Sequence, residues 1–191
     1  MSIHQHADSK KVYANVLLAY LWLTSLVSTA LALFAPEAIQ LFATQQYLGA
    51  SNVVGLLTFS YVMIGLTYIA SIGPAIVKTS TPTGVAITFS AGLNIILNFL
   101  LIPSMGMMGA AIATLISQSI IPIYLFWRSQ QMYPIPYRFQ PAIAILGLSA
   151  LLIWAGTHWS FDNLLLGIGF KIALLVLFVP AIFIFRIVTL K

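Results

Sequence analysis

The residues of this sequence that could take part in chemistry are a few polar side chains set within long apolar runs. Asn94 and Asn98 lie four residues apart, and Gln118 lies in the next apolar run. A side-chain amide is costly in an apolar environment unless it finds a hydrogen-bonding neighbour or a wet cavity. We therefore name these three residues as substrate-cavity candidates. The alternative is that they are structural, because polar side chains also hydrogen-bond neighbouring membrane helices together.

A single charge, Lys171, lies well inside an apolar run and is the fourth substrate-cavity candidate. A lysine at the centre of a bilayer costs roughly 2.5 to 3.5 kcal/mol. One interpretation is that its long stem carries the ammonium to the interface. The other is that the ammonium faces a solvated cavity and attracts an anion such as a diphosphate.

Other kinds of site find little support in these residues. The three acids fall in three separate polar segments, and neither a catalytic carboxylate pair nor a Gly-x-Ser-x-Gly turn occurs. The sequence has no cysteine, and its three histidines lack further ligands nearby. We expect no catalytic residue, no metal and no cofactor, so the chain is predicted not to be an enzyme.

The composition requires a lipid environment around the elements that carry these residues. Of the 191 residues, 61% are hydrophobic and only 6% are charged, against roughly 25% charged in soluble domains. The mean hydropathy is +1.03. The net charge of +5 comes from scattered basic residues rather than from a stripe, which argues against nucleic acid as a partner. The predicted fold class is an all-α integral membrane protein.

The hydropathy pattern predicts six transmembrane helices, separated by short polar segments that leave no room for a soluble domain. The first run also imitates a cleavable signal sequence, but it is longer than the usual signal core of about 7 to 15 residues. The expected spans are residues 13–34, 53–73, 84–102, 107–127, 142–156 and 164–185.

The distribution of basic residues predicts the orientation of these helices. No lysine or arginine occurs in the segments 35–52, 103–106 and 157–163. Glu37 lies in the first of these segments, and we predict that no acid lies inside a span. Because cytoplasmic loops are enriched in positive charge, both termini are predicted to lie in the cytoplasm. The flanking basic residues, all on the same predicted side, are Lys10, Lys11, Lys78, Arg128, Arg138, Arg186 and Lys191.

The segment between the third and fourth spans predicts a helical hairpin with a very short turn. Proline lacks the N–H that continues a helical ladder, and glycine readily takes positive φ, so Pro103 and Gly106 favour a turn there. Small residues allow the backbones of membrane helices to approach closely. The predicted helix-packing residues are Gly106, Gly109, Ala110 and Ala113.

This hairpin resembles polysaccharide-export flippases of the multidrug/oligosaccharidyl-lipid/polysaccharide exporter superfamily, which include the O-antigen flippases. The resemblance is carried by the form Leu-Asn-x-x-Leu-Ile-Pro-x-x-Gly-x-x-Gly-Ala-Ala-Ile-Ala-Thr, read here at residues 97–114. Residues 34–39 and 46–50 are also similar to a short segment of that family. The likeness covers residues 12–140, and the last two spans match it in number only.

The resemblance implies that the chain corresponds to the C-terminal part of a flippase with 12 to 14 helices. It would comprise a tail at residues 1–11, a four-helix segment at 12–141 and two additional helices at 142–191. The implied partners are the bilayer, a lipid-linked oligosaccharide used in lipopolysaccharide synthesis, and a separate chain that supplies the missing N-terminal lobe. The implied location is the inner membrane of a bacterium. Alternatives are a fragment of a related cation-coupled drug exporter, or a non-transporting membrane protein or gene remnant.

Overall fold

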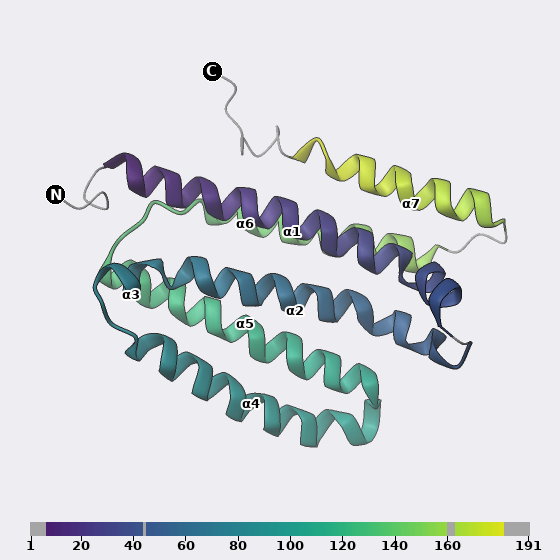
Figure 1. Cartoon of the computed structure of the whole chain (residues 1–191), viewed down its shortest axis with the longest axis horizontal. Helices are drawn as coiled ribbons and strands as arrows, with labels where there is room; N and C mark the ends of the chain where they lie inside the picture. Colours follow the sequence, from purple (N-terminus) through teal and green to yellow (C-terminus); the bar gives the residue numbers. More distant parts are fainter. Residues whose placement is uncertain (1–6, 44, 160–162, 182–191) are drawn as a thin grey trace. The chain divides into compact units, whose positions relative to one another are not determined.

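The computed structural model describes residues 7–43, 45–159 and 163–181, and these residues fold into helices with no strand among them (Figure 1). In chain order the elements are α1 (Ala7–Phe42), the 3-10 helix η2 (Gln45–Ala50), α2 (Ser51–Ala70), α3 (Ile72–Ile76), α4 (Thr81–Met105), α5 (Met107–Met132), α6 (Phe139–His158) and α7 (Leu164–Phe178).

Five helical segments of the described chain are long and apolar enough to cross a membrane. The fifth, α6, has 20 residues and not the 15 predicted, so it reaches the usual spanning length. Within the described residues the predicted sixth span contains α7, whose 15 residues rise about 22 Å, and residues 182–185 of that span lie outside the described residues. The all-helical membrane fold is confirmed for five spans, and the sixth stays a prediction.

The first helix corrects the sequence analysis at its C-terminal end. We predicted a polar segment from residue 35, but α1 continues through Pro36 to Phe42. Proline removes one helical hydrogen bond and crowds the preceding turn, but membrane helices tolerate it where neighbouring groups satisfy the freed carbonyl, so the apolar residues beyond it can extend the helix. Glu37 therefore lies within the candidate span Ser9–Phe42, and the prediction that no acid lies inside a span is wrong.

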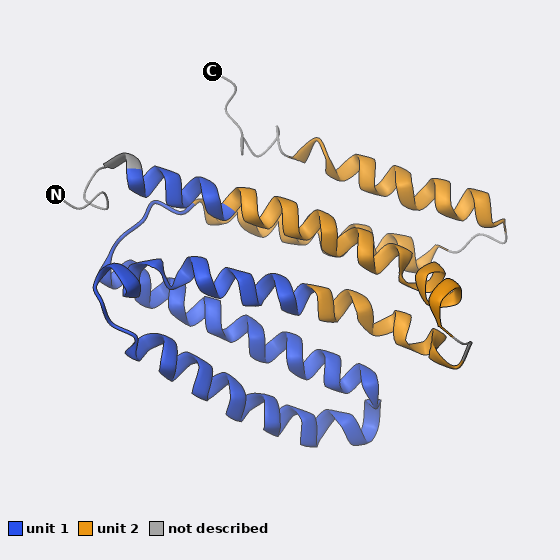
Figure 2. Cartoon of the chain, in the orientation of Figure 1, with its two compact units in different colours: residues 1–17, 59–137 blue, residues 18–58, 138–191 orange. Residues whose placement is uncertain are grey.

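The chain divides into two compact units, shown in Figure 2. Unit 1 comprises residues 1–17 and 59–137, and it contains the α4–α5 hairpin and a small core that includes Ala86, Ile121 and Leu125. Unit 2 comprises residues 18–58 and 138–191, and it contains most of α1 together with α6 and α7. Each unit holds one group of candidate functional residues.

The hairpin of unit 1 has a turn of one residue. Helix α4 ends at Met105, α5 begins at Met107, and Gly106 between them has a φ of 55°. The turn prediction is correct for Gly106, but Pro103 lies inside the last turn of α4 rather than ending the helix. The helix continues past Pro103 because the Gly106 N–H still donates to the Ile102 carbonyl, at 2.8 Å.

Candidate functional site

The polar residues of the hairpin divide into two groups by their partners. Ser90 on α4 is buried, and its hydroxyl donates to the Ser117 carbonyl of α5 at 2.7 Å. Asn98 on α4 instead donates to Asn94 on the same helix, at 2.9 Å. Ser90 thus joins the two helices, whereas the two asparagines satisfy one another in part and bind no group of α5.

The remaining candidate of the hairpin, Gln118, is half-buried on α5. It makes no hydrogen bond within the described residues, although its neighbours Ser117 and Ser119 both donate to backbone carbonyls of α5. The structure therefore places Asn94, Asn98 and Gln118 in unit 1 without joining them into one hydrogen-bonded cluster.

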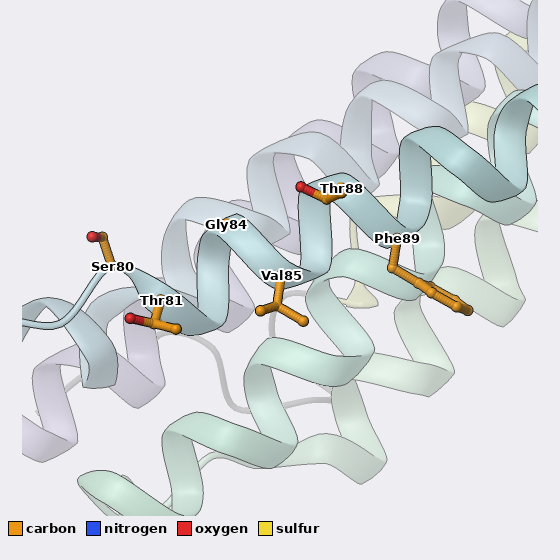
Figure 3. A pocket seen from close by; sticks show the side chains of 6 residues that line it. All are labelled: Ser80, Thr81, Gly84, Val85, Thr88 and Phe89. Carbon is orange, nitrogen blue, oxygen red and sulfur yellow. The ribbon is translucent and has the colours of Figure 1, made fainter.

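Helix α4 is the least covered of the five candidate spans. Only 11% of its most apolar window is buried, against 39% for α5 and 44% for α1. An open pocket of about 620 Å³ lies along its first turns (Figure 3), and residues of this one stretch line it: Ser80, Thr81, Gly84, Val85, Thr88 and Phe89. The pocket is a hollow on the face of a single helix rather than a site enclosed between helices.

The four predicted packing residues have different environments. A Cβ atom at Gly109 would overlap the carbonyl group of Leu101, so this glycine lets α5 meet the α4 backbone. At Gly106 a Cβ would meet nothing, and its positive φ is the reason for glycine there. Ala113 is fully buried, whereas Ala110 is half-buried.

Unit 2 contains a buried hydroxyl cluster that the sequence analysis missed. Thr29 on α1 and Ser149 on α6 lie within hydrogen-bond distance at 2.6 Å, and both are fully buried. Ser28, also on α1, donates to Thr58 on α2 at 2.8 Å. The spacing of Ser25, Ser28 and Thr29 on one helical face was the available signal. These contacts hold α1 against α2 and α6.

Lys171 on α7 forms an ion pair with Glu37 on α1. Its ammonium lies 2.5 Å from Glu37 Oε1 and 5.8 Å from the centroid of the Phe34 ring. The side chains of Lys171 and Glu37 are only 13% and 28% exposed. Glu37 Oε2 is buried and finds no partner within the described residues. The charge that the sequence left alone in an apolar run therefore has a counterion on another helix.

Basic residues of unit 1 gather at one end of the hairpin. Because α4 and α5 are antiparallel, Lys78 before α4 and Arg128 in the last turns of α5 lie at the end opposite Gly106. Lys10 lies over the Tyr133 ring at this end, 4.5 Å from its centroid. Lys10, Lys78 and Arg128 thus lie at one end of the hairpin, and the side of the membrane that this end faces stays a prediction.

Tyr137, at the same end, packs inside unit 1. It is 8% exposed, and its hydroxyl donates to the Ile69 carbonyl at 3.3 Å. Its ring meets that of Phe126 edge to face. Burial raises the pKa of the Tyr137 hydroxyl above its ordinary value, and the nearby Tyr13 adds to this shift.

The five long apolar helices define a multi-pass α-helical membrane protein that contacts the lipid bilayer. In comparisons with family models, curated proteins and solved structures, none matches the chain.

Proposed function

We propose that this chain is the C-terminal part of a flippase that translocates lipid-linked oligosaccharide for cell-surface polysaccharide synthesis. It is not an enzyme, and it acts in the inner membrane of a bacterium with both termini in the cytoplasm. Its sixth transmembrane helix is the segment that begins with α7. Alternating access needs two lobes that move about a central site. Transport by these helices therefore requires a second lobe.

The observation that carries this proposal is the hairpin at residues 97–114, whose sequence resembles the flippase family. The glycines of that form have distinct physical roles here, since Gly106 makes the turn and Gly109 lets α5 approach the α4 backbone. The poor burial of α4 and the incomplete hydrogen bonding of Asn94 and Asn98 support an additional partner next to this helix.

Rescue of a flippase-deficient bacterium tests the proposal. The chain is expressed alone and together with the N-terminal lobe of the deleted flippase, and surface polysaccharide is measured. We expect no rescue by the chain alone and rescue by the two parts together. The same lobe expressed without the chain is the control. Failure of both combinations, with both proteins present in the membrane, would contradict the flippase assignment.

The orientation has its own test, because the chain has no cysteine. A single cysteine introduced at Ser104 next to the hairpin turn is expected to react with a membrane-impermeant thiol reagent added to intact cells. A cysteine at Lys78, at the opposite end of the hairpin, is expected to react only after the cells are opened. The reverse pattern would overturn the proposed orientation.

A cation-coupled exporter is a second candidate, and one observation favours it. Such proteins need an acid within the membrane to bind the coupling ion. Glu37 lies in a candidate span, contrary to the sequence analysis, but its carboxylate is already paired with Lys171. Export of a cationic drug that depends on Glu37 and persists without any lipid-linked sugar would favour this candidate.

A further inference from the structure

The Glu37–Lys171 pair uses only part of its hydrogen-bonding capacity. The ammonium has three N–H groups, and within the described residues Glu37 Oε1 is its one acceptor. The carboxylate has two oxygens, and Oε2 is buried with no described partner. A pair that served only to join two helices would be more stable with these groups satisfied. Within the described residues, the pair therefore leaves hydrogen-bonding groups of both side chains unused.

One helical turn from the Glu37–Lys171 ion pair, apolar side chains pack α1 and α7 against α6. Gly156 on α6 has no Cβ, and the space is filled by Leu33 of α1 and Leu174 of α7. Leu33 precedes Glu37 by four residues and Leu174 follows Lys171 by three, so each leucine lies on the same helical face as its charge. The α1–α6–α7 contact therefore does not depend on the ion pair alone.

The Phe34 ring gives the ammonium a second favourable neighbour. A cation near an aromatic face is attracted to it, and the attraction increases when water is excluded. The Lys171 side chain is 13% exposed, so it is mostly buried but still accessible from outside the protein. If the Glu37 side chain moved away, the ammonium would stay beside Phe34 and would need a new anionic partner.

We propose that Lys171 is an anion-binding site that Glu37 masks. The ligand class is an oxyanion such as a phosphate or diphosphate, because such a group takes the place of the carboxylate and offers several oxygens to the ammonium. Glu37 then acts as an internal competitor, since the ligand binds only when the carboxylate leaves. Only one part of this proposal rests on the proposed function, namely that the natural ligand is the phosphate part of a lipid-linked oligosaccharide.

The test is the binding of radiolabelled diphosphate to the purified chain in phosphatidylcholine nanodiscs, measured by equilibrium dialysis. We expect E37Q to bind diphosphate at least tenfold more tightly than the wild-type chain. K171Q and the double variant E37Q/K171Q should show no binding above empty nanodiscs. E37D, which keeps the masking charge, should stay within about threefold of wild type. Helical content by circular dichroism checks that each variant folds.

Two results would overturn the masked site: E37Q binding no more tightly than wild type, or E37Q/K171Q binding as tightly as E37Q. If E37Q does not fold, the wild-type chain is compared at millimolar diphosphate with E37Q/K171Q, in which neither charge is left unpaired. Weak binding by the wild type that the double variant lacks supports the site, and equal binding overturns it.

Repeating the E37Q measurement in nanodiscs that contain phosphatidylglycerol identifies the source of the oxyanion. A loss of diphosphate affinity that remains at high ionic strength, where repulsion between diphosphate and the anionic surface is screened, means that a lipid headgroup occupies Lys171. Unchanged affinity points to a phosphate that is not a bulk lipid. The assay contains no transport step. Diphosphate binding without rescue of the flippase-deficient strain would support the anion site and contradict the flippase assignment. Rescue without diphosphate binding would support the flippase assignment and contradict the anion site.

Discussion

Polar side chains pair differently in unit 2 and in the hairpin of unit 1. In unit 2 the polar groups pair between helices, as Thr29 does with Ser149 and Glu37 with Lys171. On α4 the two amides pair along their own helix, and much of that helix is exposed. Ser90 is the exception on α4, because it binds the backbone of α5.

This difference indicates where the chain depends on something outside itself. A hydrogen bond between two membrane helices holds them together, whereas a bond within one helix contributes nothing to its association. The hydroxyl contacts of unit 2 therefore serve the chain's own packing. The amides of α4 remain open to another helix or a wet cavity. Four predictions test this comparison, in order of decreasing expected effect.

The largest effect is expected from breaking the ion pair of unit 2 on one side. In E37Q the Lys171 ammonium loses its counterion, which should reduce the free energy of unfolding by about 2 to 3 kcal/mol. E37Q/K171Q removes both charges and should lose less than about 1 kcal/mol. Titration with sodium dodecyl sulfate in mixed micelles, followed by circular dichroism, measures both. If the loss in E37Q/K171Q equals the sum of the losses in E37Q and K171Q, the charges do not act as a pair.

The next effect concerns the hairpin contact. Gly109→Ala places a Cβ onto the Leu101 carbonyl group, and backbone atoms cannot move as a side chain does. We expect a loss of about 1 to 3 kcal/mol in the same titration. The control is Gly92→Ala on the open part of α4, where a Cβ meets nothing within 4 Å. There alanine should raise the free energy of unfolding by about 0.5 to 1 kcal/mol. Equal effects at the two glycines would rule out close packing as the reason for Gly109.

A smaller effect is expected in the hydroxyl cluster of unit 2. Ser149→Ala removes the contact with Thr29 and the bond to the Ser25 carbonyl, and should cost about 0.6 to 1.5 kcal/mol. Thr157→Ala on the same helix is the control, because Thr157 is exposed and bonds only carbonyls of α6. It should change stability by less than about 0.5 kcal/mol. If both changes cost the same, the cluster does not hold α6 to α1.

The smallest effect on stability is expected for the amides of α4. N94L/N98L should alter the free energy of unfolding of the isolated chain by less than about 0.5 kcal/mol, because no bond to another helix is lost. The same variant should fail to rescue polysaccharide export when the N-terminal lobe is supplied. Strong destabilisation of the isolated chain would place these amides among its own packing contacts and would remove the contrast with unit 2.

Much of the helical pattern could be predicted from local sequence. Long apolar runs require helices in lipid, since only a helix satisfies its backbone within one segment. Gly106 was predictable because the need for positive φ is a local property. The end of α1 was not, because proline and polar residues signal a boundary without enforcing it, and the helix passes through Pro36.

The candidate sites show the same limit. The sequence singled out Lys171 by its charge, Asn94 and Asn98 by their spacing, and the small residues of the hairpin by their size. It gave no sign that Glu37, 134 residues from Lys171, would be its partner. Nor did it indicate that Tyr137 turns inward, because an aromatic residue near a helix end is equally compatible with a headgroup contact.

The sequence alone therefore determined the solvent of this protein, the approximate positions of its helices and the residues whose polarity needs an explanation. These depend on composition and on the local periodicity of the chain. Only the tertiary structure decided which polar groups meet, which glycine is close-packed and which helix is left uncovered. Those outcomes depend on contacts between residues far apart in sequence, and no local pattern specifies them.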